Sequence, residues 1–429
     1  MEKPLVNLVT LGCSKNLVDS EYLLRQLEYN GFKVLHNANS TEAKIIIINT
    51  CGFILDAKQE SIDMILSYVH AKKAGTIEQI YVFGCLSQRY LKELKEEMPE
   101  VDDFFGVFES HLIIKRLKGS YHSQLKNERT LTTPSHYAYL KIAEGCNRRC
   151  SFCAIPQIKG KYASRELSDI LEEAKFLASI GVKELILIAQ DVTYYGLDIH
   201  KNDLLPQLIE EISRIESIEW IRLQYLYPHN LSNSLIEQIK DNPKVCKYFD
   251  IPVQHISDKM LQIMRRGHTK KDIINKFSEI RDNIPDAAIR TTLLVGHPGE
   301  TKKDFHELLQ FVNNYKFDRL GVFQYSHEEQ TYSYHNYKDS ISAKEKQSRH
   351  QIIMETQKDI SHQKNQSFIN KTLPVMVDNA ESDYYIGRTQ YDSPEIDGEV
   401  IIYKSNIQPG SIYSLKISGA DEYDLMVES

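Results

Sequence analysis

Three cysteines in one short loop constrain this chain more than any other feature of its sequence. Cys146, Cys150 and Cys153 have the spacing C-x-x-x-C-x-x-C, and an aromatic residue, Phe152, precedes the last of them. A fold that contains this loop brings three sulfur ligands close together. Thiolates are soft ligands, and both zinc ions and iron–sulfur clusters bind them. The loop therefore predicts a soft, electron-rich metal site.

The number of cysteines separates the candidate metals. A structural zinc site closes with four protein ligands, and a four-iron cluster with four cysteines is fully capped. Three cysteines leave one iron open for a non-protein ligand. The methionine part of S-adenosylmethionine (SAM) can chelate such an iron, and the cluster can then break the carbon–sulfur bond of SAM with one electron. A zinc ion that takes one of the 15 histidines as its fourth ligand stays open as the alternative.

The remaining sequence argues against disulfides as the role of these cysteines. No apolar segment near residue 1 resembles a signal peptide, so we expect a reducing compartment and a cytoplasmic protein. No window approaches the roughly 18 apolar residues of a membrane span.

The first ~118 residues predict a small α/β domain. Strands are expected over residues 5–11, 45–49 and 80–83, with amphipathic helices between them, for example over 19–29. Residues 45–48 are four consecutive isoleucines, a run that indicates a strand buried on both faces of a parallel sheet.

A cysteine follows each of these three strands. Cys13, Cys51 and Cys85 come at or just after the strand ends, and Gly12 and Gly84 beside them allow tight turns. Ligand sites of open parallel sheets form outside the carboxyl ends of the strands. We therefore expect these cysteines to converge on one edge as a second three-cysteine site. Three buried structural cysteines remain the alternative.

A polar linker is expected over residues 119–135, and a second α/β segment follows it. Its predicted strands lie over residues 137–142, 184–190, 220–226, 248–252, 288–295 and 320–325. Six such units suit an open, partial barrel rather than a closed eightfold one. The cysteine triplet follows the first strand, at the face where such barrels keep their chemistry.

The last part of the chain predicts a long exposed helix over residues 341–370 and then a small five-stranded barrel of the OB type. The residues from Lys371 onward include four basic and eleven acidic side chains, so this segment carries the whole formal charge of −7. Its acidity favours a basic protein as partner over a nucleic acid.

Several runs resemble one known family. Residues 11–21, 49–54, 189–196 and 391–398 are similar to motifs of the methylthiotransferases, a radical SAM family, and the likeness spans essentially the full length. They resemble the branch that modifies an aspartate of the twelfth protein of the small ribosomal subunit. The branch that modifies an adenosine of transfer RNA typically has a Gln-Met-Asn run after its first cysteine, which is absent here. Lys159-Gly160 stands where the family usually shows Arg-Gly.

The resemblance implies an architecture and an activity. The expected parts are a methylthiotransferase N-terminal domain over residues 1–119, a radical SAM core over 132–363 and a TRAM domain over 366–429. The expected reaction adds a methylthio group to the β-carbon of an aspartate, with one SAM for methylation and one for radical generation. Methylthiolation of a transfer-RNA adenosine is the alternative, and a non-catalytic iron–sulfur or zinc protein that binds RNA is another.

The resemblance also implies the cofactors and their ligands. Cys146, Cys150 and Cys153 would hold the SAM-cleaving 4Fe-4S cluster. Phe152 would lie near the SAM adenine, and simple packing of the loop is the alternative for this residue. The second triplet would hold an auxiliary 4Fe-4S cluster, and its members are Cys13, Cys51 and Cys85. No catalytic side chain is assigned. The expected partners are a basic ribosomal protein, met on the assembled subunit or free from it, a sulfur donor and an electron donor.

Other residues have two interpretations each. Two basic pairs, Arg148-Arg149 and Arg265-Arg266, are interpreted either as guides for the substrate or as solvated surface residues. Glu300 contacts SAM or caps the following helix, and His255 and His297 contact substrate or are satisfied structural histidines.

Overall fold

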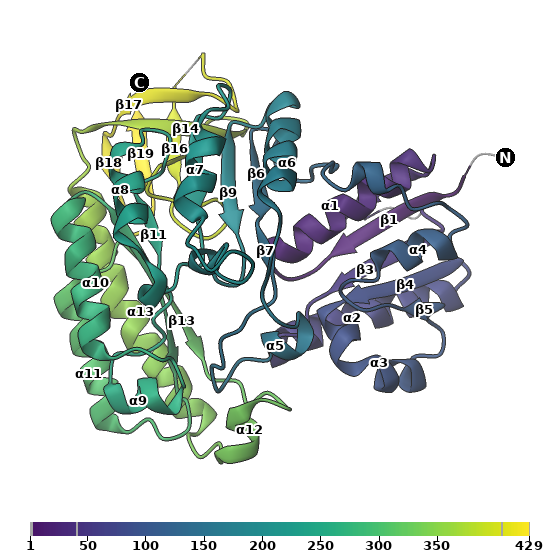
Figure 1. Ribbon diagram of the computed structural model, residues 1–429, viewed down its shortest axis with the longest axis horizontal. Coiled ribbons are helices and arrows are strands. Elements are labelled where there is room, and N and C mark those ends of the chain that lie inside the picture. Colours follow the sequence, from purple (N-terminus) through teal and green to yellow (C-terminus); the bar gives the residue numbers. More distant parts are fainter. Residues whose placement is uncertain (1–2, 40–41, 405, 429) are drawn as a thin grey trace. The chain divides into compact units, whose positions relative to one another are not determined.

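The computed structural model describes residues 3–39, 42–404 and 406–428 (Figure 1). The chain forms two compact units, each built from separate stretches of sequence. The first unit contains Met1–Thr133, Tyr139–Asn147 and Cys153–Leu177. The second contains Pro134–Ala138, Arg148–Phe152 and Ala178–Ser429. The chain from Cys153 to Leu177 is grouped with the N-terminal sheet in the first unit.

The first unit contains a five-stranded parallel sheet with the order β2-β1-β3-β4-β5. Its strands are β1 (Leu5–Thr10), β2 (Lys33–His36), β3 (Ile45–Thr50), β4 (Gln79–Gly84) and β5 (Asp103–Phe104). Its principal helices are α1 (Ser14–Tyr29), α2 (Leu55–Lys73), α3 (Cys85–Glu97) and α4 (Ser110–Arg116), seen among the purple and blue ribbons of Figure 1. The three predicted strands are confirmed, and the sheet gains two short edge strands that the sequence did not reveal.

The isoleucine run of β3 explains why this sheet is covered on both faces. Ile46 and Ile48 pack in one apolar cluster, and Ile45 and Ile47 pack in another. All four are at most 4% exposed. Side chains alternate between the two faces of a strand, so only a sheet buried on both sides accommodates four of them in succession.

The segment expected as a polar linker is held down by a buried ion pair. Arg129 is 2% exposed, and its guanidinium lies 2.6 Å from Glu21 on α1 and 2.7 Å from Glu173 on α6 (Leu167–Ser179). A buried charge needs partners of opposite sign. The linker is therefore fixed to the first unit by charge, a feature that its polar composition concealed.

The second unit contains most of the partial barrel. Its strands are β6 (Tyr137–Lys141), which begins in this unit, β9 (Glu184–Ile188), β10 (Trp220–Leu223), β11 (Tyr248–Asp250), β12 (Ala288–Val295) and β13 (Arg319–Gln324). Within it, β9 pairs with β10, and β11 and β13 pair with β12, all in parallel. Helices lie between the strands, namely α7 (Leu205–Ser213), α8 (Asn233–Asp241), α10 (Lys270–Asn283) and α11 (Lys302–Tyr315). The α/β class and the six strands expected here are confirmed.

The long helix after the barrel is α13 (Ala343–Gln366), and it is less exposed than its composition suggested. Ile353 is fully buried and Ile360 is 5% exposed, since the helix lies against β13 and α11. The side chain of Ser342 accepts a hydrogen bond from the backbone N–H of Glu345 and caps its start. No helix among the described residues is both long and apolar enough to cross a membrane.

The C-terminal segment forms a curled sheet of six strands, with the order β17-β14-β15-β16-β19-β18 (Figure 1, yellow). The strands are β14 (Thr372–Ala380), β15 (Tyr385–Thr389), β16 (Val400–Tyr403), β17 (Ile412–Lys416), β18 (Gly419–Ala420) and β19 (Leu425–Glu428). The five-strand expectation was one short. The additional strand, β18, has two residues, too few to be read from sequence alternation.

Charged pairs join this sheet to the barrel within the second unit. The guanidinium of Arg319 donates to Asp392 at 2.7 Å, and Arg290 lies 3.3 Å from Asp397. Asp378 lies 2.7 Å from His136. Part of the acidity that we assigned to an external partner is therefore neutralised inside the chain.

Candidate metal centres and their surroundings

The triplet of Cys13, Cys51 and Cys85 lies at the carboxyl edge of the N-terminal sheet. Cys13 is the residue before α1, Cys51 follows β3 directly, and Cys85 opens α3 directly after β4. Cys13 is exposed, Cys51 is half-buried and Cys85 is buried. Because β1, β3 and β4 are adjacent and parallel, the structure brings these three thiols to one edge, as predicted from their positions after the strands.

Close backbone approaches show how tightly this edge is packed. Gly12 has φ of +94°, and a Cβ on it would lie 2.8 Å from the Cβ of Cys51. A Cβ on Gly52 would lie 2.7 Å from the backbone of Leu86. Real Cβ atoms do not approach so closely, so only glycine fits at both positions. The segments that carry the three cysteines thus lie directly against one another.

Asn16 ties the three strand ends together. Its side-chain amide donates to the carbonyls of Leu11 (3.0 Å) and Thr50 (3.2 Å), and its Oδ1 lies 3.7 Å from the Sγ of Cys85. Asn16 is 2% exposed. The sequence interpretation missed this residue, although its place three residues after Cys13 on α1 is the signal that could have found it.

Lys159 supplies a buried positive charge near Cys85. Its Nζ lies 3.0 Å from Asp19 and 3.8 Å from Glu144, and both carboxylates also pair with Lys141. Burial disfavours the charged form of Lys159, but the two carboxylates outweigh it and its pKa is raised. Burial raises the pKa of the Cys85 thiol to about 12, and the charge of Lys159 opposes that rise.

The same segment packs against Cys85 through apolar side chains. Ala154 and Ile158, the latter on α5 (Ile155–Ile158), form a small buried cluster with Cys85 and Val107. Ala154 comes directly after Cys153. Within the first unit, the chain that follows Cys153 therefore contacts Cys85.

The residues of the C-x-x-x-C-x-x-C loop are assigned to both units. Cys146 and Cys153 belong to the first unit, and Cys150 belongs to the second. The backbone N–H of Cys146 donates to the carbonyl of Gly160 at 3.1 Å, which closes the loop on the first unit's side.

In the second unit, the guanidinium groups of two arginines lie on the ring of Tyr227, and one of them contacts Cys150. Arg266 donates from Nη1 to the Sγ of Cys150 at 3.2 Å, and its guanidinium lies 4.8 Å from the ring centre of Tyr227. The guanidinium of Arg148 lies 3.6 Å from the same ring centre and pairs with Asp191 at 2.9 Å. Of the two basic pairs in the sequence, one member of each thus has fixed partners, since Arg266 is buried and Arg148 is half-buried, which the solvated interpretation did not foresee.

Phe152 lies in an apolar cluster of the second unit. It packs with Met260, Met264, Leu294 and Tyr325, and its ring meets that of His297 edge-on at 6.3 Å. The predicted neighbour of the adenine is therefore half-buried in an environment that suits a flat aromatic ring.

His297 is a satisfied structural histidine. Its Nε2 lies 3.2 Å from the hydroxyl of Ser151 and 2.9 Å from that of Ser333, and its Nδ1 lies 2.9 Å from the carbonyl of Pro298. Burial lowers its pKa to about 4, so the ring is neutral at pH 7.

Glu300 does not cap a helix. It is 4% exposed, its carboxylate lies 2.8 Å from Arg349 on α13, and it faces His255 at 3.5 Å. The cap of α11 is instead Thr301, whose side chain accepts from the backbone N–H of Asp304. Glu300 thus joins α13 to the barrel.

The donor set of the sheet edge fits an iron–sulfur cluster. Its ligands are three thiols, and Gly12 and Gly52 keep the surrounding backbone free of Cβ atoms that would crowd them. Within residues 3–39, 42–404 and 406–428, no three Cys, His, Asp or Glu side chains are grouped to hold a single metal ion. A four-iron cluster instead spreads its cysteine ligands over separate irons.

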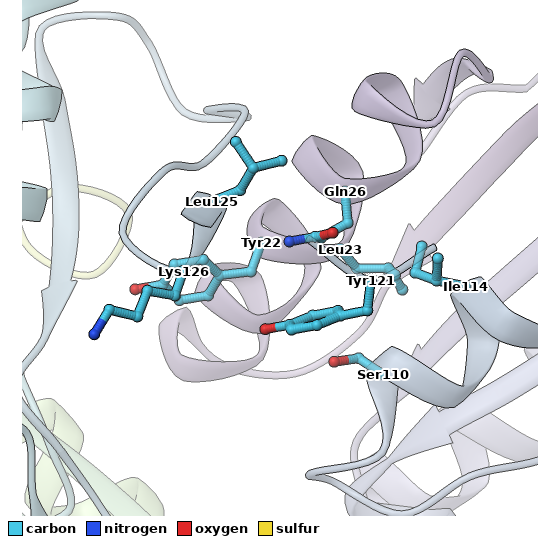
Figure 2. Close-up of a pocket in the computed structure, with 8 residues that line it drawn as sticks. All are labelled: Tyr22, Leu23, Gln26, Ser110, Ile114, Tyr121, Leu125 and Lys126. Atoms are coloured by element: carbon cyan, nitrogen blue, oxygen red, sulfur yellow. The ribbon is translucent and has the colours of Figure 1, made fainter. Parts of the chain in front are cut away.

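The first unit also contains a pocket of about 170 Å³ beside α1 and α4 (Figure 2). Eight residues line it: Tyr22, Leu23, Gln26, Ser110, Ile114, Tyr121, Leu125 and Lys126. None of the six cysteines is among them. Tyr121, Leu125 and Lys126 come from the segment that was expected as a linker, so the pocket lies where this segment packs on α1.

Three family models match successive parts of the chain. The uncharacterized protein family UPF0004 matches residues 5–106, the Radical SAM superfamily matches residues 140–312, and the TRAM domain matches residues 369–429.

Full-length relatives are also found. The chain is 50% identical over 430 residues to the ribosomal protein uS12 methylthiotransferase RimO of Bacteroides fragilis, with 100% of both chains covered. It is 50% identical over 429 residues to the protein of the same name from Cytophaga hutchinsonii, which covers 100% of this chain and 98% of the relative.

Two solved structures show the fold. TsrM from Kitasatospora setae, a radical SAM methyltransferase, aligns with a TM-score of 0.55 at 14% identity over 75% of both chains. OxsB, a cobalamin-dependent SAM radical enzyme, aligns with a TM-score of 0.53 at 14% identity, over 82% of this chain and 56% of that one.

Proposed function

The chain belongs to the family of ribosomal protein uS12 methylthiotransferases, and we propose that it adds a methylthio group to the β-carbon of an aspartate in that ribosomal protein. Residues 1–119 form the methylthiotransferase domain in this proposal, residues 132–363 the radical SAM core and residues 366–429 the TRAM domain. The chain is 50% identical in sequence, over its full length, to two relatives that carry this same name, and this supports the assignment.

Two 4Fe-4S clusters and SAM are the proposed cofactors. Cys146, Cys150 and Cys153 hold one cluster, while the other is held by the sheet-edge triplet, Cys13, Cys51 and Cys85. When bound, these groups supply the radical that removes a hydrogen from the aspartate and the methylthio group that replaces it.

Residues around the two cysteine sites position the cluster ligands and the bound SAM. Asn16 fixes the strand ends that carry the sheet-edge triplet, and Lys159 provides a compensating positive charge beside Cys85. Phe152 offers a flat apolar face to the adenine of SAM.

The observation that carries the proposal is the convergence of Cys13, Cys51 and Cys85 at one sheet edge, in a chain that also contains the C-x-x-x-C-x-x-C loop. A radical SAM enzyme that only cleaves SAM requires one three-cysteine site. The second such site supports a reaction in which a sulfur group is held for transfer.

The substrate defines the partners and the place of action. Because the target is a ribosomal protein, the enzyme acts in the cytoplasm, on uS12 that is free or assembled in the small subunit. The reaction also needs a one-electron donor and a sulfur donor.

The first test is metal analysis after anaerobic reconstitution. Three forms are compared: wild type, the Cys146/Cys150/Cys153→Ala variant and the Cys13/Cys51/Cys85→Ala variant. We expect about eight irons in the wild type and about four in each variant. Zinc in place of iron, or a sheet-edge variant with undiminished iron, would contradict the two-cluster proposal.

The second test concerns the substrate. The reconstituted enzyme is incubated with SAM, sulfide, dithionite and either uS12 or unmodified transfer RNA, and the products are read by mass spectrometry. We expect one methylthio group in place of one hydrogen on a uS12 aspartate. Modification of an adenosine, with uS12 unchanged, would identify the transfer-RNA branch instead.

A further inference from the structure

The guanidinium of Arg266 connects a cysteine sulfur to a barrel strand end. It is 7% exposed, it donates from Nη1 to the Sγ of Cys150 at 3.2 Å, and it donates from Nη2 to the carbonyl of Pro252 at 2.6 Å. Pro252 follows β11 closely. The planar guanidinium holds its donors in a rigid fork. It therefore fixes the position of this sulfur relative to the barrel.

Neighbouring groups hold Arg266 in place. Its guanidinium lies on the ring of Tyr227, and the hydroxyl of Tyr227 donates to the backbone carbonyl of Arg266. Arg148, within the cysteine loop, lies on the same ring and pairs with Asp191. The hydroxyl of Thr193 donates to Asp191 at 2.5 Å. The donor to Cys150 is thus part of a connected network rather than a loose surface side chain.

The adjacent arginine provides a contrast. Arg265 is exposed, and its guanidinium lies 4.3 Å from the ring centre of Tyr332. The backbone of Arg265 has a φ of +56°. The side chains of Arg265 and Arg266 have different surroundings. The two arginines have the same charge and are neighbours in sequence, so Arg265 is a matched control for Arg266.

We propose that Arg266 is a positioning residue that tunes the SAM-cleaving cluster through its hydrogen bond to the Cys150 sulfur. This inference rests on the proposed function. Reduction adds one electron, and so one negative charge, to the cluster. Hydrogen bonds to cluster sulfurs stabilise the added charge and raise the reduction potential. The buried cation therefore eases transfer of an electron from the donor.

The test measures reduction of one cluster in the full-length chain. In a Cys13/Cys51/Cys85→Ala parent, only the loop cluster contributes to the signal. Arg266→Gln, Arg266→Lys and Arg265→Gln are made in this parent, reconstituted anaerobically and titrated by electron paramagnetic resonance. Iron content and circular dichroism confirm loading and folding for each variant.

The expected results differ between the variants. At the ambient potential that half-reduces the parent, we expect Arg266→Gln to lower the ratio of reduced to oxidised cluster about tenfold, equivalent to about 59 mV for one electron. Arg266→Lys keeps the positive charge but loses the forked donors of the guanidinium. Its ratio of reduced to oxidised cluster should therefore lie between those of the parent and Arg266→Gln. Arg265→Gln should match the parent.

The outcomes separate this inference from the function on which it rests. An unchanged ratio in iron-loaded Arg266→Gln overturns the inference. If Arg266→Gln fails to load iron, Arg266→Lys decides: a ratio below that of the parent supports the inference, and a ratio equal to it overturns it. A parent without iron would overturn the proposed function itself, whatever the variants do.

Discussion

The Sγ of Cys85 lies 3.7 Å from the Oδ1 of Asn16, a side chain whose amide also binds the carbonyls of Leu11 and Thr50. One buried side chain therefore contacts the ends of three neighbouring strands. The relative positions of the three strand-end cysteines depend on it.

Replacing Asn16 with alanine should weaken the sheet-edge cluster. The change removes two hydrogen bonds to buried carbonyls, a cost of about 0.5–1.5 kcal/mol each. We expect iron in the reconstituted protein to fall from about eight to about four per chain. Iron quantitation and urea unfolding measure the two effects. The exposed Asn314→Ala is the control, and equal iron in both variants would contradict the role of Asn16.

Replacing Lys159 with methionine should destabilise the apoprotein. Asp19 and Glu144 are half-buried and keep Lys141, so the loss of the second lysine should cost about 1–3 kcal/mol. Urea unfolding under reducing, metal-free conditions measures the loss. Lys159→Arg should retain most of the stability, and exposed Lys161→Met should change it by less than about 0.5 kcal/mol. Equal losses in the two methionine variants would refute the prediction.

His297 should make stability depend on pH. Its pKa falls from 6.5 to about 4 on folding, because the ring is buried. Between these values the unfolded chain binds a proton that the folded chain does not. Stability is therefore fully present above pH 6.5 and decreases as the pH falls towards 4, by up to about 1.4 kcal/mol per unit.

Urea unfolding of the apoprotein at several pH values measures this slope. His297→Gln keeps hydrogen-bonding groups but does not titrate, so its slope should be smaller by that amount. His268, whose pKa burial lowers to about 3, contributes a slope of the same sign that remains in the variant. Identical slopes in variant and wild type would contradict the assignment to His297.

The ion pair between Arg319 and Asp392 should be important for docking of the C-terminal sheet on the barrel. Their side chains are 11% and 3% exposed, so Arg319→Met leaves a buried, unpaired carboxylate and should cost about 3–5 kcal/mol. Adding Asp392→Asn should recover part of the loss. The half-exposed pair Lys183–Glu219 gives the comparison, for which Lys183→Met should cost at most about 1 kcal/mol. Additive effects of the Arg319 and Asp392 changes would rule out the coupling.

The three central strands of the first sheet and the place of the cysteines that follow them could be predicted because both depend on local pattern. Four isoleucines in succession indicate a strand buried on both faces, and the residue after a parallel strand lies at the sheet edge. The edge strand β2 escaped prediction because it has four residues and no fully buried side chain. Its pairing with β1 stabilises it, which no local pattern records.

The surroundings of the cysteines were not predictable in the same way. Lys159 meets Asp19 across 140 positions of sequence, and Arg266 meets Cys150 across 116. Which of two adjacent arginines lies inside depends on the backbone turn at Arg265 and on the partners that await each side chain. Such contacts exist only after the chain has folded.

The first unit is built from three separate stretches of sequence, and this affects how it forms during synthesis on the ribosome. Glu21 emerges from the ribosome more than a hundred residues before its partner Arg129, and Glu173, which completes the charge cluster, emerges later still. Elongation at about 5–20 residues per second separates these events by several seconds or more. During that interval the N-terminal sheet lacks α5 and α6, and Cys85 lacks its cover from Ala154 and Ile158. The nascent domain therefore presents the Cys85 thiol to the solvent before the chain that will cover it has been translated.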